Sequence, residues 1–161
     1  MHYKILNILL FVIVLITQSC QQQKKQIFKT VKTENMDTTN YNKLTAEEEY
    51  VILHKGTERP FTGELLDNKE KGTYICRRCN APLYKSQDKF ESHCGWPSFD
   101  DSIAGKVAYR KDESHGMIRV EIVCASCGGH LGHVFDDGPT ETTGKRYWKT
   151  HFTTWLLLRR M

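Results

Sequence analysis

Four of the six cysteines occur as two Cys-x-x-Cys pairs, Cys76 with Cys79 and Cys124 with Cys127. Each pair follows a strand-like stretch and is followed by small residues and then an apolar one, so the two segments form a weak internal repeat. A tight turn after a strand points both sulfurs of a pair in the same direction. Two such turns supply four thiolates, the tetrahedral ligand set that structural zinc prefers. We therefore predict one structural zinc ion per chain, with no open position for substrate or water.

Two other interpretations of these cysteines stay open. In an oxidising compartment they would form two disulfides, and a Cys-x-x-Cys pair is also the pattern of a redox dithiol. The matching pairs favour zinc. Because residues 80–123 separate the pairs, the two turns must clamp a folded insert.

Strands and one short helix are the elements predicted to position these turns. Residues 73–75 lead into the first pair and residues 118–122 into the second, and the latter alternate apolar and charged side chains, as a half-buried strand does. The segment from Thr45 to Glu48 fits a capping box. A helix is expected from about Ala46 to His54, with its end at Gly56.

Composition limits the classes of function. The 161 residues suffice for one domain with accessory segments, and a hydrophobic content of 39% excludes a wholly disordered chain. The net charge is +4, and the charges are interspersed along the sequence. Nucleic-acid binding is therefore not expected, because it needs a clustered basic face.

The first residues are typical of an export signal. Lys4 precedes an apolar run over residues 5–16, which is too short for a comfortable membrane span. Residues 17–20, Thr-Gln-Ser-Cys, resemble a bacterial lipoprotein box, in which the cysteine, here Cys20, is lipidated. We predict a signal peptide over 1–19, a flexible tether over 20–43 and a folded domain over 44–161, tethered to a membrane in the bacterial cell envelope. An uncleaved N-terminal anchor is the alternative.

Several further strings are distinctive in their content and order: residues 56–65, 94–99, 114–117, 130–139 and 144–147. Together with the four cysteines they resemble the B-type methionine sulfoxide reductases, which act on the R epimer. The resemblance runs from about residue 44 to Tyr147. It implies a mainly β fold of two antiparallel sheets with short peripheral helices, and a zinc ion remote from the chemistry.

The resemblance also implies a reaction on oxidised proteins or peptides. A thiolate attacks the sulfoxide sulfur, an acid protonates the departing oxygen, methionine leaves, and the enzyme remains as a sulfenic acid. A second cysteine condenses with the sulfenic acid to a disulfide, which a thioredoxin-like donor reduces. We expect a monomer that has these substrates and this reductant as partners.

Four side chains are candidates for holding the sulfoxide. Trp96 offers a flat apolar wall for the methyl group, and the family places it there. Phe135 would add to that wall, and core packing is the alternative for both rings. His130 and His133 supply imidazoles that donate to or protonate the oxygen near neutral pH. Their alternatives are zinc ligation, although four cysteines already fill the metal, and burial as satisfied core histidines.

Three more side chains are candidates for the redox chemistry. Cys94 is the cysteine left after the zinc and lipid assignments, and the family places its resolving cysteine there; an inert buried thiol is the alternative. Asp137 would orient a histidine or a water, or cap the Asp-Gly-Pro turn. Arg146 would lower the pKa of a nearby thiol, or lie on a solvated strand.

Trp148 stands where the family has its nucleophilic cysteine, directly after the Arg-Tyr pair. An indole cannot form a sulfenic acid, and Lys149 and Thr150 replace the family's aliphatic residue and asparagine. The resemblance ends abruptly after Tyr147, which is what a reading-frame shift produces, and resequencing the gene tests that hypothesis. The chain as it stands is predicted to show activity near background. A non-catalytic module that binds methionine sulfoxide, or a zinc-ribbon interaction module, is the alternative.

Overall fold

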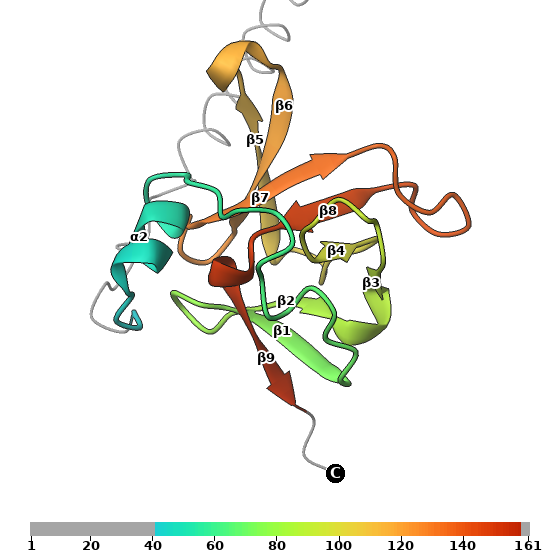
Figure 1. Ribbon diagram of the computed structural model, residues 1–161, viewed down its shortest axis with the longest axis horizontal. Helices are drawn as coiled ribbons and strands as arrows, with labels where there is room; N and C mark the ends of the chain where they lie inside the picture. The colour runs from blue at the N-terminus through green and yellow to red at the C-terminus, as the bar shows by residue number, and fades with distance from the viewer. Residues whose placement is uncertain (1–40, 159–161) are drawn as a thin grey trace, which may run out of the picture. The chain divides into compact units, whose positions relative to one another are not determined.

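The computed structural model describes residues 41–158, and these residues form two antiparallel sheets with one short α-helix (Figure 1). The predicted fold class, mainly β with two antiparallel sheets and short peripheral helices, is confirmed. The predicted signal peptide, Cys20 and most of the predicted tether lie outside the described residues. No helix within 41–158 is long and apolar enough to cross a bilayer.

The larger sheet has six strands and the smaller has three. The order in the larger sheet is β3 (Lys89–Phe90), β4 (Ser98–Phe99), β8 (Arg146–Lys149), β7 (His130–Phe135), β6 (Arg119–Cys124) and β5 (Val107–Asp112). The order in the smaller sheet is β2 (Pro82–Lys85), β1 (Gly72–Cys76) and β9 (Thr154–Leu158). The helix is α2 (Ala46–Ile52), and three 3-10 turns are η2 (Ser86–Asp88), η3 (Ser114–Gly116) and η4 (His151–Thr153).

Helix α2 begins at the predicted capping box. The Thr45 side chain accepts from the Glu48 backbone, and the Glu48 carboxylate accepts from the Thr45 N–H at 2.7 Å. The helix ends at Ile52, two residues before the expected end. Its C-terminal end is closed by a hydrogen bond of 2.9 Å from the Gly56 N–H to the Tyr50 carbonyl, after Lys55 with a φ of 59°.

The core lies between the two sheets and is built largely from aromatic rings. Tyr74 from β1 and Tyr84 from β2 pack on Phe99 from β4, with ring centroids 4.8 and 4.6 Å away. All three side chains are fully buried, together with Ile122 of β6 and Leu131 of β7. Side chains from strands of both sheets therefore meet in one cluster.

Strand β6 is present as predicted, but its burial does not alternate. Ile118, just before the strand, is 80% exposed and Val120 is 42% exposed, whereas Glu121 and the residues that follow it in the strand are buried on both sides. Burial of Glu121 is possible because it is hydrogen-bonded in the interior: Lys55 Nζ donates to it at 2.8 Å, and His130 Nδ1 lies 2.8 Å away. A buried carboxylate with two such partners avoids the usual penalty for burying charge.

The segment after Tyr147 continues the fold. Residues 146–149 complete β8, and β9 pairs with β1 from the Gly72–Leu158 pair to the Cys76–Thr154 pair. Lys149, however, is fully buried at 0% exposure. Its ammonium lies by the Thr154 hydroxyl, with the Tyr74 and Phe99 rings 4.9 and 5.2 Å away. Burial outweighs the attraction of Glu58 and lowers the Lys149 pKa from 10.5 to about 7.

Replacement of Lys149 by the apolar Lys149→Met is expected to stabilise the protein. A lysine whose pKa is lower in the folded state opposes folding fully below about pH 7, and less as pH rises towards 10.5. The gain should be roughly 3 to 5 kcal/mol below pH 7, since one unit is worth about 1.4 kcal/mol. Urea unfolding of both proteins between pH 6.5 and 10 measures it. A gain that does not shrink with rising pH would contradict the account, and Lys145→Met, at an exposed site, is the control.

Candidate functional site

The two Cys-x-x-Cys turns have the same backbone hydrogen bonds. Asn80 donates to the Cys76 carbonyl at 2.9 Å, and Gly128 donates to the Cys124 carbonyl at 2.8 Å. Both donors have a positive φ, 60° and 69°, a conformation in which asparagine and glycine are the usual residues. The internal repeat seen in the sequence is therefore a repeat of structure.

These turns bring four sulfur atoms together within 4.8 Å of one another, in residues Cys76, Cys79, Cys124 and Cys127. The Cys76–Cys127 and Cys79–Cys124 sulfurs are 3.7 and 3.6 Å apart. A tetrahedral ion with bonds of about 2.3 Å to sulfur needs ligand atoms roughly 3.8 Å apart. The four residues therefore fit a metal ion. All described cysteines are free, which does not support the two-disulfide alternative.

Two buried histidines lie on β7, each held by a carboxylate. His130 Nδ1 is 2.8 Å from Glu121 Oε1, and His133 Nε2 is 2.7 Å from Asp112 Oδ2. The rings are 5.6 Å apart, and the second ring nitrogen of His133 is buried with no partner among the described residues. Arg119 Nη2 donates to the same Asp112 oxygen at 2.7 Å. These contacts fix the orientation of both imidazoles.

The environment keeps both imidazoles neutral near pH 7. Burial lowers the pKa of His130 and His133, and the carboxylates Glu121 and Asp112 offset only part of that effect. Hydrogen bonds from Ser114 and His133, with the charge of Arg119, hold the pKa of Asp112 well below its ordinary value. Each histidine is thus a neutral ring beside an ionised carboxylate, able to carry a proton when one is supplied.

Trp148 occupies the space beside these histidines. The register of β7 and β8 places Trp148 opposite His133, and the two rings are 5.8 Å apart. On its other side the indole meets Trp96 edge to face at 4.8 Å. Trp148 is 8% exposed. The position that the family resemblance assigns to a thiol is therefore filled by a large apolar ring.

Cys94 lies half-buried in the loop between β3 and β4. Ser92 Oγ donates to its sulfur at 3.0 Å, and Ser98 Oγ is 3.5 Å from it. Burial raises the pKa of the thiol, but the two serine hydroxyls, the Trp96 backbone contact and the charge of Arg146 outweigh burial, so the net pKa is lowered. Cys94 is the described cysteine that stands outside the four-sulfur cluster, and it is more acidic than an ordinary thiol.

The remaining predicted site residues lie together at the end of β7 and β8. Arg146 binds Asp137 through two bonds of 2.9 Å, and its guanidinium lies 4.7 Å above the Phe135 ring. Asp137 therefore orients Arg146, which in turn influences Cys94. Phe135 supports this arginine.

Sequence reasoning missed Asp112 and Glu121, the carboxylates that hold the histidines. Glu121 belongs to the alternating stretch before Cys124, where charged residues were expected to face solvent. Its place directly across from β7 follows from the pairing of Glu121 with His133. The sequence signal that could have indicated Glu121 is its position as a charged residue within a strand that leads into a cysteine turn.

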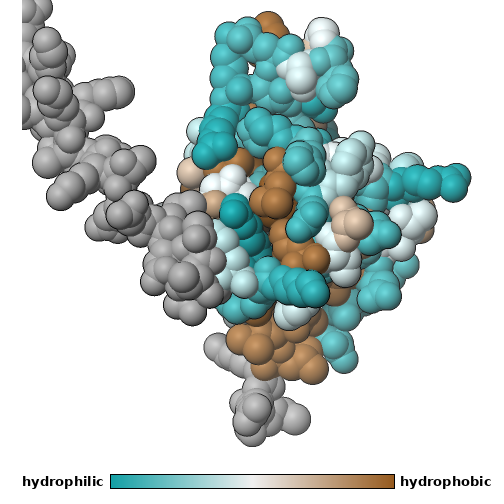
Figure 2. Space-filling view, turned by 90° about the vertical axis from the view of Figure 1, so that its left-hand side faces the viewer, coloured by the Kyte–Doolittle hydropathy of each residue, from teal (hydrophilic) through white to brown (hydrophobic). Residues whose placement is uncertain are grey.

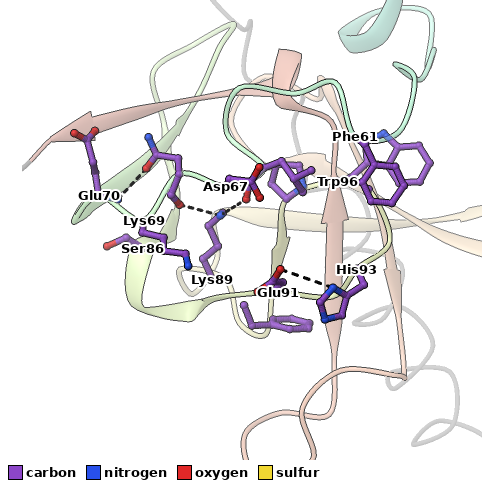
Figure 3. A pocket seen from close by; sticks show the side chains of 14 residues that line it. Phe61, Asp67, Lys69, Glu70, Ser86, Lys89, Glu91, His93 and Trp96 are labelled. Carbon is purple, nitrogen blue, oxygen red and sulfur yellow. Dashed lines mark hydrogen bonds and ion pairs between the residues drawn. The ribbon is translucent and has the colours of Figure 1, made fainter.

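A cavity of about 640 Å³ lies beside Trp96 (Figure 3). Phe61 and Trp96 lie together at one end of it, and Lys89 and His93 are among the other residues that line it. Lys89 Nζ donates to the carbonyls of residues 66 and 68 at 2.6 and 2.9 Å, which fixes the loop over the cavity. The β7 histidines are not among the residues that line it.

Comparison with known proteins identifies the family. The SelR domain model matches residues 44–150. The chain belongs to the SelR domain family. Peptide methionine sulfoxide reductase MsrB of Alteromonas mediterranea is 57% identical over 105 residues, which cover 65% of this chain and 73% of that protein. The MsrB of Saccharophagus degradans is 58% identical over 107 residues, covering 66% and 79%, and that of Agrobacterium fabrum is 48% identical over 117 residues, covering 72% and 86%.

Proposed function

We propose that this SelR-domain chain carries the site of a peptide-methionine (R)-sulfoxide reductase and that Trp148 blocks the reaction in the chain as it stands. The observation that carries the proposal is the arrangement of β7, β8 and the Cys94 loop. His133, held by Asp112, and the Trp96 ring flank Trp148. His130 lies next to His133, and the Cys94 sulfur lies 3.5 Å from the Oγ of Ser98, the strand residue that pairs with Trp148. The names of the SelR-domain relatives support the same activity.

The roles follow from what each side chain offers. Trp96 presents an apolar ring for the methyl group of the sulfoxide. His133, held by Asp112, takes up a proton from water and passes it to the sulfoxide oxygen. With a thiolate at position 148, its sulfur attacks the sulfoxide group, and the protonated oxygen passes to the cysteine sulfur as its bond to the methionine sulfur breaks. Methionine leaves, and the cysteine remains as a sulfenic acid. The Cys94 thiolate then displaces the hydroxyl from that sulfur, and with a proton from solvent the products are a disulfide and water. A thioredoxin-like dithiol returns both cysteines to thiols.

Trp148 removes two requirements of this reaction at once. Its indole provides no sulfur nucleophile, and its ring fills the space between Trp96 and His133. The same filling argues against a module that binds methionine sulfoxide beside the β7 histidines without reducing it.

Restoring the thiol is expected to restore turnover. Trp148→Cys should raise the rate of methionine-(R)-sulfoxide reduction by on the order of 100-fold or more over the natural chain. Trp148→Ser, which also empties the pocket but supplies no thiol, should remain near background. Consumption of NADPH in the presence of thioredoxin, thioredoxin reductase and each sulfoxide epimer measures both. A natural chain as active as Trp148→Cys, or equal rescue by Trp148→Ser, would refute the proposal.

A second substitution tests whether Cys94 is the resolving cysteine. In the Trp148→Cys background, adding Cys94→Ser should stop thioredoxin-driven turnover after about one equivalent of methionine, because no disulfide can form. A small dithiol reductant should still support turnover.

We also propose that the four-sulfur cluster holds a structural zinc ion. Zinc prefers four thiolates in this geometry, and the four sulfur atoms lie within 4.8 Å of one another. Cys76, Cys79, Cys124 and Cys127 would hold the ion, which would clamp the ends of β1 and β6 together.

Removal of one ligand is expected to release the metal and loosen the fold. Cys124→Ser should lower the zinc content to well below one ion per chain, as measured by inductively coupled plasma mass spectrometry. It should lower the free energy of unfolding by on the order of 3 kcal/mol or more. Cys94→Ser, the matched control, should keep both values. Natural protein purified without metal from zinc-replete cells would contradict this assignment.

We further propose that the chain is a lipoprotein of the bacterial cell envelope, tethered through Cys20. The support is the apolar run over residues 5–16 followed by Ser19 and Cys20. Mass spectrometry of membrane-extracted protein should find Cys20 as a lipid-modified N-terminus. An unmodified Cys20 inside a continuous N-terminal peptide would contradict it.

A further inference from the structure

Strand β9 of the three-stranded sheet carries exposed apolar side chains that the reductase site does not use. Trp155, Leu157 and Leu158 of β9 are 48, 58 and 53% exposed, and we call them the β9 patch. Figure 2 shows apolar side chains gathered at the lower end of the described residues, where Figure 1 places β9. Exposed apolar side chains gathered in one place mark an interaction site more often than scattered ones do.

The sheet register explains why Trp155 and Leu157 point outward, whereas Leu158, on the same side as Leu156, is exposed because it lies at the end of the strand. Tyr74 is buried and pairs with Leu156, so this pair faces the core. The flanking pairs, Ile75 with Trp155 and Thr73 with Leu157, therefore face the other side of the sheet. β9 lies at the edge of this sheet (Figure 1), so the β9 patch forms one border of it.

The indole of the β9 patch is held in place from within the domain. The Arg77 guanidinium lies 3.9 Å from the Trp155 ring centre, while the same arginine is ion-paired with Glu48. A cation over an aromatic face is attractive. Trp155 is therefore fixed at the surface, and ordering it on binding would lose little conformational entropy.

Basic residues border the β9 patch. Lys85 pairs with Thr73, which pairs with Leu157, so Lys85 lies on the same outer face and is exposed. The exposed Lys71 precedes Gly72, the partner of Leu158. Glu70, beside Lys71, is the acidic neighbour in the sequence, so the border carries net positive charge.

We propose that the β9 patch and its basic border bind the surface of an anionic lipid bilayer. A tryptophan and leucines that enter the boundary between headgroups and acyl chains, with lysine and arginine next to anionic headgroups, are a recognised combination for surface binding. Each basic residue near such a surface contributes favourably. This contact does not depend on lipid at Cys20, and it would hold one face of the domain against the membrane.

The test follows the contact of Trp155 with lipid in the full chain. Vesicles of phosphatidylcholine and phosphatidylglycerol in a roughly 2:1 ratio, with brominated acyl chains, should quench Trp155 fluorescence by about twofold or more. The Trp155 signal is the difference between the natural chain and Trp155→Phe, which retains Trp96 and Trp148. Leu157→Glu should abolish the quenching and so should Leu158→Glu. Ile118→Glu, which is 80% exposed on the β5–β6 hairpin, is the matched control and should not change it.

Each alternative outcome overturns the proposal. Equal quenching in vesicles of phosphatidylcholine alone would remove the role of charge, and equal quenching in Leu157→Glu would remove the β9 patch. A dimer in lipid-free solution that Leu157→Glu dissociates would assign the patch to a second copy of this chain. Unchanged thermal unfolding of the two glutamate variants shows that they remain folded, and Cys20→Ser should give the same quenching as the natural chain, which separates this proposal from lipidation.

Discussion

The pairing of β7 with β8 is the constraint on which the candidate site depends. It places residue 148 directly opposite His133, so the side chain at 148 always lies at the imidazoles. Gly132 makes this close approach possible, because a Cβ there would lie 2.0 Å from the Trp148 carbonyl oxygen. The φ of 150° at Gly132 is also one that other residues rarely adopt. The strands thus fix where chemistry would occur, and the side chain at 148 decides whether it does.

Short sequence patterns predicted the helix start and the cysteine turns correctly, because both depend on interactions between residues close in the sequence. The capping box involves residues three apart, and each cysteine turn closes on its own backbone, so Thr45, Glu48 and the four cysteines were found from spacing alone. Asp112 and Glu121 were missed because their partners come from another strand. The alternation of apolar and charged residues wrongly predicted that Glu121 faces solvent. Its burial is possible because Lys55 and His130 are hydrogen-bonded to it. The cavity beside Trp96 depends on loops whose packing no short-range pattern reports.

The segment after Tyr147 shows where the sequence and the fold disagree. The SelR match ends at Thr150, yet β9 still pairs along β1. This segment can form a strand because pairing with β1 depends mainly on backbone hydrogen bonds. Stability is reduced at Lys149, because burial of this amine among Tyr74 and Phe99 disfavours its charged form.

Whether the Trp148 indole fills the sulfoxide position is most directly tested by the His133 ring signals in nuclear magnetic resonance spectra. Methionine-(R)-sulfoxide with its amino and carboxyl groups capped would be titrated into the natural chain and into Trp148→Ser. The account predicts that the His133 signals shift in saturable fashion in Trp148→Ser and do not move in the natural chain. Saturable shifts of equal size in the natural chain would show an open site and contradict the account.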